Sequence, residues 1–291
     1  MPLPRYRVFT STDAAAMSRL EFKARQVVEG MITGQHKSPH RGFSVEFSEH
    51  REYTPGDELR HLDWRAYARS DRYYIKLYEQ ETNLRATIVI DTSNSMRFAQ
   101  KMDYAKHLAA CVAYLLSLQQ DLAGLVAVDD QVRVELPPGS SAPHLDRMFR
   151  ALEGIVPSGN TDLVKQLHAL AENAPRRSLF ILISDLWLDP DALVRALQHA
   201  RYKRHQLMVL HLLDKAEIDL PYDQQITLHD LETDEKIEID ANDLRPSYKK
   251  QVEDFLTRTR KACNDSGAEY HRIFVDVPYE RALVSLMNRR Q

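Results

Sequence analysis

The hydrophobic and polar positions change their period along the chain. Within residues 18–33 the apolar positions recur every three or four residues, which predicts a short amphipathic helix. From Gly34 to Glu81 the stretches SVEFSEHREY and YYIKLYEQE alternate instead, and TPGDE between them has the residues of a turn. We therefore expect an N-terminal unit at residues 1–82 that consists of a helix and a small β-rich segment.

From Asn83 onward, apolar runs alternate with amphipathic stretches. The runs RATIVI, SLFILIS and QLMVLHLL are continuous, as expected for strands that are covered on both faces. LAGLVAVDDQVRVELPP predicts a strand or a hairpin. Helices are expected at residues 102–120, 144–155, 161–174 and 189–202. Strands that alternate with helices of this length predict an α/β fold, a mostly parallel sheet with helices on both faces.

The alternation pauses after Leu213. QQITLHDLETDEKIEID predicts a β-hairpin, followed by a helix over 247–267 that ends near Gly267, a strand over 269–277 and a helix over 279–290. The second unit is therefore expected to span residues 83–291, with a hairpin insertion at about 216–245.

Composition and charge narrow the possible classes of function. The chain has 291 residues, of which 43% are hydrophobic and 28% charged, so it can bury a core of ordinary size. Its formal net charge is −3, and acidic residues nearly balance the basic ones even in the histidine-rich stretch from His36 to Lys76. Without a basic face we expect no nucleic-acid partner.

The apolar stretches and the cysteines predict where the protein resides. The most apolar stretch, LAACVAYLLSL, has 11 residues, whereas a membrane span needs about 20. The N-terminus lacks the apolar run of a signal peptide. Cys111 and Cys263 form no CxxC motif and are expected to be free thiols. We therefore expect a cytoplasmic protein with no membrane span.

Three loops that follow predicted strands carry oxygen-bearing side chains. The first holds Asp91, Ser93 and Ser95, the second holds Thr161, and the third holds Asp185. In an open parallel sheet such loops meet at the carboxyl edge, where ligands bind. Hard oxygen donors suit Mg²⁺ or Mn²⁺. Because only two of the five are carboxylates, the bound cation would attract a further anionic oxygen from a partner.

Helix capping is the alternative explanation for the first loop. Asp and Ser often satisfy the unpaired N–H groups where a strand leads into a helix. The matching positions of Thr161 and Asp185 favour the metal site over capping. We interpret Asp162, which follows Thr161, as a local helix cap rather than a metal ligand.

These residues carry a resemblance to known proteins. DTSNS, with Thr161 and Asp185, resembles the metal-ion-dependent adhesion site (MIDAS) of the von Willebrand factor type A domain. The stretch from HRGFSVEF to IVIDTSNSM resembles the bacterial family called Domain of Unknown Function 58, whose Gly-Asp…Arg…Asp-Trp signature appears here from Gly56 to Trp64. The similarity covers about residues 20–215.

The resemblance implies a von Willebrand factor A-like, Rossmann-like fold and a role for each site residue. Ser93, Ser95 and Thr161 would contact the metal, and Asp91 and Asp185 would bind it directly or through water. Asn160 stands where the family pattern often has a second glycine, which leaves the loop geometry open. The signature segment itself could be a partner surface, but a structural turn locked by an Asp–Arg pair, with Trp64 packed on the core, is favoured.

Three functions are compatible with these features. Similar proteins are often encoded beside MoxR-type AAA+ ATPases, which implies a non-catalytic interaction module. Its cation would bind a carboxylate of the ATPase or of a client protein. The two proteins would then act in chaperone-like maturation of protein complexes. The chain has no phosphate-binding loop of its own.

A Mg²⁺-dependent phosphatase or other hydrolase is the second possibility, and a scaffold with a vestigial site is the third. A phosphatase of this type needs a carboxylate two residues after Asp91, where this chain has Ser93, and a lysine near the third loop, where we identify none. We therefore predict no catalytic residue.

Overall fold

The computed structural model describes residues 19–34, 49–52, 73–77, 84–223, 225–229 and 236–288. The chain divides into two compact units, one of residues Lys37–Asn83 and the other of Met1–His36 together with Leu84–Gln291. The signature segment from Gly56 to Trp64 lies outside the described residues. In the smaller unit, β1 (Glu49–Glu52) pairs antiparallel with β2 (Tyr74–Leu77), as the alternating pattern predicts.

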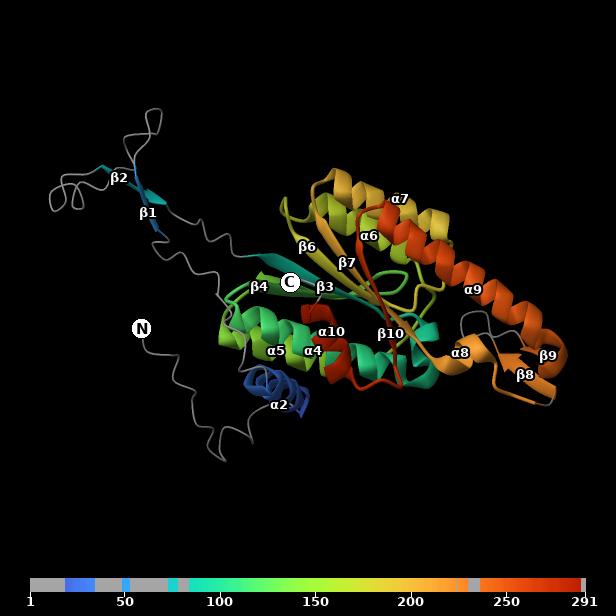
Figure 1. The fold of residues 1–291 in the computed structure, drawn as a ribbon. Helices are drawn as coiled ribbons and strands as arrows, with labels where there is room; N and C mark the ends of the chain where they lie inside the picture. Colours follow the sequence, from blue (N-terminus) through green and yellow to red (C-terminus); the bar gives the residue numbers. More distant parts are fainter. Residues whose placement is uncertain are drawn as a thin grey trace. The chain divides into compact units, whose positions relative to one another are not determined.

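The larger unit is built on a six-stranded sheet with the order β10-β7-β6-β3-β4-β5 (Figure 1). All neighbouring strands are parallel except β5, which pairs antiparallel with β4. The strands are β3 (Arg85–Asp91), β4 (Leu122–Val128), β5 (Val132–Gly139), β6 (Leu179–Ser184), β7 (Gln206–Leu213) and β10 (Glu269–Phe274). The strand order reverses between β3 and β6, which makes their carboxyl ends the topological switch point.

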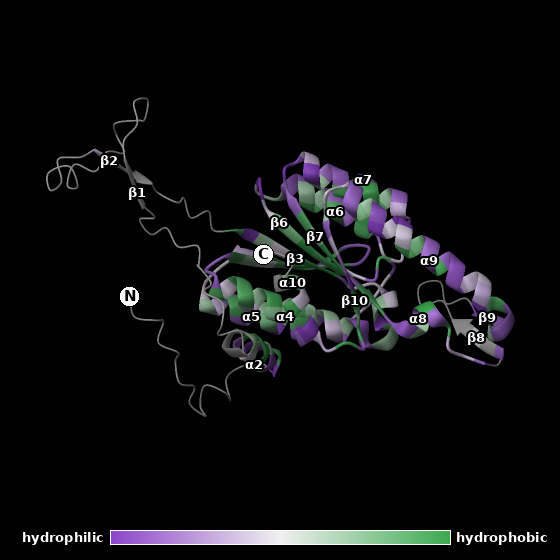
Figure 2. Cartoon of the chain, in the orientation of Figure 1, coloured by the Kyte–Doolittle hydropathy of each residue, from purple (hydrophilic) through white to green (hydrophobic). Residues whose placement is uncertain are grey.

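Helices cover both faces of this sheet (Figure 1). One face carries α2 (Arg19–Gly34), α4 (Lys101–Leu118), α5 (Ala142–Gly154) and α10 (Tyr279–Asn288); the other carries α6 (Leu163–Asn173), α7 (Pro190–Tyr202) and α9 (Ala241–Asp265). Figure 2 shows that the central strands are strongly hydrophobic. Ile88 and Ile90 enter the first core and Val89 enters the second, because successive side chains of a strand point to opposite faces. The predicted α/β class, with a mostly parallel sheet covered on both faces, is confirmed.

Helix α2 belongs with the larger unit. Its Leu20, Ala24 and Val28 are buried in the core that α4 and α5 share. The sequence-based boundary at residue 82 grouped this helix with the β-rich segment. Its apolar face packs instead on the α/β unit, and burial of that face is what stabilises an amphipathic helix.

The predicted hairpin insertion is present as a separate two-stranded sheet. Strand β8 (Gln225–His229) pairs antiparallel with β9 (Lys236–Asp240), and the short helix α8 (Lys215–Asp219) precedes them. Helix α9 begins at residue 241, earlier than the predicted 247, because Asp240 caps it and Pro246 is accommodated inside it. Gly267 ends it with φ +71°, as predicted.

The edge strand β5 has an unusual composition. Among the strands that the structure describes it pairs only with β4, its residues alternate between exposed and partly buried, and it contains Pro137 and Pro138. Both cysteines are buried free thiols, Cys111 on α4 and Cys263 on α9, as predicted. Across the described part of the chain, no helix is long and apolar enough to span a bilayer.

Candidate functional site

The three loops predicted to form a site meet at the switch point. Asp91 is the last residue of β3, and Asp185 directly follows β6, the parallel neighbour of β3. The backbone N–H of Asn94 donates to the carbonyl of Gly159 (3.1 Å), and that of Ser158 donates to the carbonyl of Thr92 (2.7 Å). These bonds hold the second loop against the first.

A continuous set of hydrogen bonds joins four of the five predicted site residues. The Ser93 N–H donates to Asp91 Oδ1 (3.0 Å), the hydroxyls of Ser93 and Ser95 lie 3.0 Å apart, and the Ser95 hydroxyl donates to Asp185 Oδ1 (3.3 Å). Asp91, Ser93 and Asp185 are buried. The Ser93 side chain caps no helix, although it begins the 3₁₀ helix η2 (Asn94–Gln100). Side chains at alternate positions of this loop therefore converge on Asp185.

Thr161 lies in the adjoining loop, and its hydroxyl has a local role. Thr161 Oγ1 accepts a hydrogen bond from the N–H of Leu163, 3.4 Å away, at the start of α6. The interpretation of Asp162 as the cap was wrong for its side chain. Asp162 occupies the N-cap position but makes no side-chain capping bond. Its φ of −129° and ψ of 42° lie outside the extended region that capping side chains use.

The structure adds a buried ammonium group that the sequence analysis missed. Lys101, the first residue of α4, is fully buried and donates from Nζ to Asp185 Oδ2 (2.5 Å) and to Glu217 Oε1 (2.6 Å). Although burial lowers the pKa of Lys101, the carboxylates of Asp185 and Glu217 raise it further, so the pKa lies above its ordinary value and the side chain is charged. The only sequence signal was a lysine placed directly before a long apolar helix.

The remaining polar atoms of the two aspartates are also bonded within the chain. The Ser184 hydroxyl donates to Asp91 Oδ2 (2.7 Å). His211 Nε2 lies 2.8 Å from the carbonyl oxygen of Asp185, and Nδ1 lies 2.7 Å from the Tyr270 hydroxyl. Burial lowers the pKa of His211 to about 4, so the ring is neutral. Because a carbonyl only accepts, Nε2 carries the proton and Nδ1 accepts from Tyr270.

The cluster is rich in negative charge for a buried site. Burial and the neighbouring Asp185 raise the pKa of Asp91 to about 6. With Asp91, Asp185 and Glu217 ionised against the one ammonium of Lys101, three negative charges and one positive leave two negative charges uncompensated. A divalent cation carries the charge that this cluster lacks.

The donor set fits a hard cation. It offers carboxylate and hydroxyl oxygens, which are the ligands that Mg²⁺ and Mn²⁺ prefer. Thr92 Oγ1 and Asn94 Oδ1, at flanking positions of the same loop, are buried without a hydrogen-bond partner in the structure described. The described residues contain no group of three or more His, Cys, Asp and Glu side chains arranged to hold a metal, so any cation here depends on the hydroxyls.

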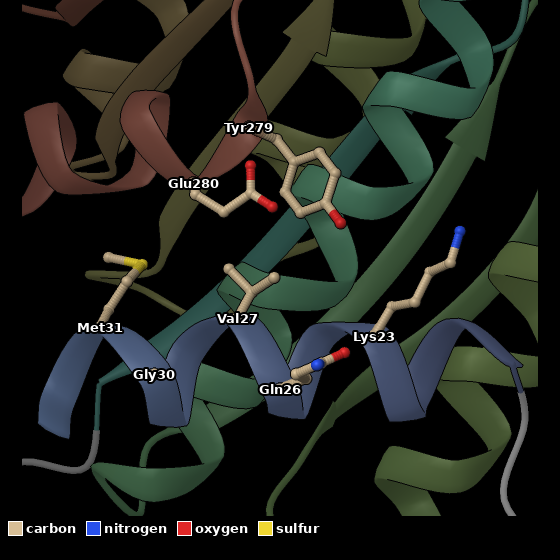
Figure 3. A pocket seen from close by; sticks show the side chains of 7 residues that line it. All are labelled: Lys23, Gln26, Val27, Gly30, Met31, Tyr279 and Glu280. Atoms are coloured by element: carbon tan, nitrogen blue, oxygen red, sulfur yellow. The ribbon is translucent and has the colours of Figure 1, made fainter. Parts of the chain in front are cut away.

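A groove elsewhere in the larger unit shares no residue with this cluster. It lies between α2 and α10, lined in part by Val27 and Met31 from α2 and by Tyr279 and Glu280 from α10 (Figure 3). It brings together no set of groups with evident chemistry. The cluster at the switch point therefore remains the candidate functional site.

Fold and site together define a doubly wound α/β domain with an oxygen-rich, buried cluster at its switch point. The sequence profile of the family described as "Protein of unknown function DUF58" matches residues 49–258, and the chain belongs to this family. Uncharacterised proteins of Mycobacterium tuberculosis and Mycobacterium bovis are 29% identical over 227 residues, which cover 76% of this chain and 71% of theirs.

Solved structures with a similar course of the chain have low sequence identity. The conserved hypothetical protein BatB from Bacteroides thetaiotaomicron is 17% identical, with a TM-score of 0.48 over 71% of this chain and 98% of its own. The VWA domain of SpRpn10 is 16% identical, with a TM-score of 0.40 over 69% of this chain and 94% of its own. Likeness at this level carries no ligand or partner from those proteins to this chain.

Proposed function

We propose that this chain is a non-catalytic protein-interaction module whose site binds Mg²⁺ or Mn²⁺ and, through that cation, a carboxylate of a partner protein. The observation that carries the proposal is the convergence of Asp91, Ser93, Ser95 and Asp185 at the switch point. Neutral hydroxyls make up half of this set. A cation held by them keeps part of its charge available for a further anionic ligand.

In this mechanism the chain's own residues hold and orient the cation. Asp91 is fixed by the Ser93 N–H and the Ser184 hydroxyl, and Asp185 is fixed by Ser95 and Lys101. A carboxylate in a fixed rotamer loses little entropy when it binds a cation. Thr161 is the fifth donor in the proposal, and its hydroxyl has an acceptor lone pair in addition to the one that Leu163 uses.

The partner proposed is a MoxR-type AAA+ ATPase, or an acidic segment of its client, in chaperone-like maturation of protein complexes in the cytoplasm. This part rests on what the family resemblance implies. Nucleotide hydrolysis would belong to the partner, because this chain contains no G-x-x-x-x-G-K-[ST] loop.

One observation favours the hydrolase as a second candidate. Lys101 supplies the cationic group that the sequence analysis found missing near the third loop. However, Lys101 has no exposed surface, and its two hydrogen bonds go to carboxylates of the chain. Position 93, where a phosphatase of this type needs a carboxylate, is a serine, so the non-catalytic module is preferred. Release of phosphate from a general phosphatase substrate, lost in Asp91→Asn, would support the hydrolase instead.

Calorimetric titration of Mn²⁺ tests the proposal on the full chain, with and without a short acidic peptide. We expect wild type to bind Mn²⁺ and to bind it more tightly when the peptide is present. Asp91→Asn should weaken Mn²⁺ binding at least about tenfold, because it removes one of the two carboxylate ligands while keeping the side-chain volume.

Asp189→Asn is the matched control for this titration. Asp189 follows β6, as Asp185 does, but its carboxylate caps α7 and forms no hydrogen bond or ion pair with the described residues of the cluster. Asparagine also caps helices well, so this variant changes the net charge equally and should leave Mn²⁺ binding unchanged. Equal binding by wild type and Asp91→Asn, or no Mn²⁺ binding by wild type even when the acidic peptide is present, would overturn the metal-bridged module.

A further inference from the structure

The ammonium of Lys101 is placed by a strained turn of the backbone. Helix η2 is interrupted at its end, and the two residues before Lys101 have positive φ angles, 49° at Ala99 and 60° at Gln100. Consecutive left-handed residues other than glycine are costly and persist where the surrounding structure fixes them. The turn allows α4 to start with its first side chain directed into the cluster rather than toward solvent.

Glu217, the second acceptor of this ammonium, is itself held firmly. Its Oε1 accepts from Trp187 Nε1 (3.2 Å) and its Oε2 accepts from the N–H of Asp214 (2.9 Å), which closes the capping box of α8. The Tyr248 hydroxyl of α9 donates to the carbonyl oxygen of Glu217 (2.6 Å). Glu217 is therefore an acceptor fixed in place by groups from three different segments.

This arrangement has a direct consequence for Asp185. Its Oδ1 accepts from Ser95 and its Oδ2 accepts from Lys101, so both oxygens are occupied by the chain. A cation that approaches Asp185 faces an ammonium within hydrogen-bond distance of the same carboxylate. A cation and an ammonium that bind the same buried carboxylate repel each other strongly, because the surroundings screen their charges little.

We propose that Lys101 regulates cation binding at this site as an internal competitor for Asp185, with Glu217 as the alternative partner that holds the ammonium when Asp185 binds a cation. The inference rests on the proposed function. The ammonium withdraws from Oδ2 but keeps its bond to Glu217, so it is never buried without a partner. Cation affinity is then set by how strongly Glu217 draws Lys101 away from Asp185.

Two substitutions should move cation affinity in opposite directions. Lys101→Met removes the competitor, keeps an unbranched side chain, and should tighten Mn²⁺ binding at least about tenfold. Glu217→Gln keeps an acceptor for the N–H of Asp214 but removes the charge that draws on Lys101, and should weaken Mn²⁺ binding several-fold. Dissociation constants for Mn²⁺ alone, measured on the full chain by calorimetry, give both results.

A thermal measurement keeps the test valid if Lys101→Met folds poorly. That variant leaves buried carboxylates unpaired, so its melting temperature without metal should fall below that of wild type. Saturating Mn²⁺ should then raise the melting temperature more in Lys101→Met than in wild type. Lys215→Met is the control, because Lys215 is a largely exposed lysine of the same helix as Glu217, paired with Asp276, and its loss should change neither quantity.

The outcomes separate this inference from the proposed function. Mn²⁺ binding by wild type that neither Lys101→Met nor Glu217→Gln alters would overturn the competitor and leave the metal-bridged module standing. Absence of Mn²⁺ binding in both wild type and Lys101→Met would overturn both. Binding that appears only in Lys101→Met would support the competitor and show that the native ammonium closes the site to the free cation.

Discussion

Two titratable neighbours of Asp185, Asp91 and His211, have pKa values shifted in opposite directions. The pKa of Asp91 rises to about 6 because the carboxyl is buried beside Asp185, so its ionisation costs stability. The folded state binds more protons there, and the contribution of Asp91 to the free energy of unfolding falls as the pH rises from about 4 to about 6. The pKa of His211 falls to about 4 through burial, so its contribution is lost as the pH falls from about 6.5 toward 4.

These opposed contributions predict a specific change in the pH profile. In wild type without metal they partly cancel between pH 4 and 6.5. Asp91→Asn removes one of them, so its free energy of unfolding should rise with pH more steeply than that of wild type, by roughly 1–3 kcal/mol across this range. Urea unfolding in the presence of chelator at several pH values measures the difference.

His211→Asn is the complementary variant for this measurement. It should flatten or reverse the rise with pH, because the buried ring that loses stability in acid is gone. Parallel profiles for wild type and Asp91→Asn would show that Asp91 has an ordinary pKa in the folded state.

The site residues that could be predicted from sequence are those that lie at the ends of strands. Asp91 and Asp185 follow continuous apolar runs, and the sheet topology then brings them together. Lys101 could not be predicted, because a lysine at a helix start is normally solvated and only its two carboxylate partners justify its burial. Those partners lie 84 and 116 residues further along the chain, outside the reach of any local pattern.

At the scale of elements, the start of α7 allows the contribution of one helix cap to the free energy of unfolding to be measured. Asp189 accepts hydrogen bonds from the N–H groups of Asp191 and Ala192, each at 3.2 Å, and Pro190 occupies the first helical turn. Asp189→Ala should lower the free energy of unfolding by about 1 kcal/mol, measured by urea denaturation.

Asp191→Ala is the matched control for this cap. Asp191 lies in the same first turn, where its negative charge interacts favourably with the helix dipole. Its side chain is exposed and makes no capping hydrogen bond. Its loss should cost at most a few tenths of a kcal/mol. Equal losses in both variants would mean that charge near the helix end, rather than the two capping bonds, stabilises α7.

Element boundaries were predicted well at two strong caps and poorly at the start of α9. Asp189 marked the start of α7 correctly, and Gly267 marked the end of α9 correctly. The start of α9 was predicted at residue 247, directly after Pro246, whereas the helix begins at Ala241, Asp240 supplies the cap and Pro246 lies inside the helix. Asp162 was taken for a capping side chain, but it makes no side-chain capping bond, and the Thr161 hydroxyl accepts from the N–H of Leu163, the first residue of α6.

At the scale of the whole molecule, the two cysteines report on opposite faces of the sheet. Cys111 lies in the core with α4 and α5, and Cys263 lies in the core with α6 and α7. Burial is the main cause that raises the pKa of each thiol to about 12, so neither should react with a thiol reagent while the sheet is intact. Cys111→Ala leaves Cys263 as the one thiol, and Cys263→Ala leaves Cys111. If both helical layers unfold together with the sheet, the thiols of these two variants should react at equal rates at each urea concentration.

Unequal labelling would reveal independent layers. Faster reaction of Cys263 in moderate urea would mean that α9 separates from the sheet before the other core opens. Labelling in high urea, where both thiols should react fully, serves as the control.

The composition of β5 determines how the larger unit can associate through that edge. An edge strand normally exposes a row of N–H and C=O groups to which another chain can add a strand. Pro137 and Pro138 have no backbone N–H to donate, and the pairing of β5 with β4 shifts register between Ala123 and Leu125, so the strand is irregular there. A second copy or an extended peptide therefore has a poor template for continuing the sheet beyond β5, which protects this side of the protein from edge-to-edge aggregation.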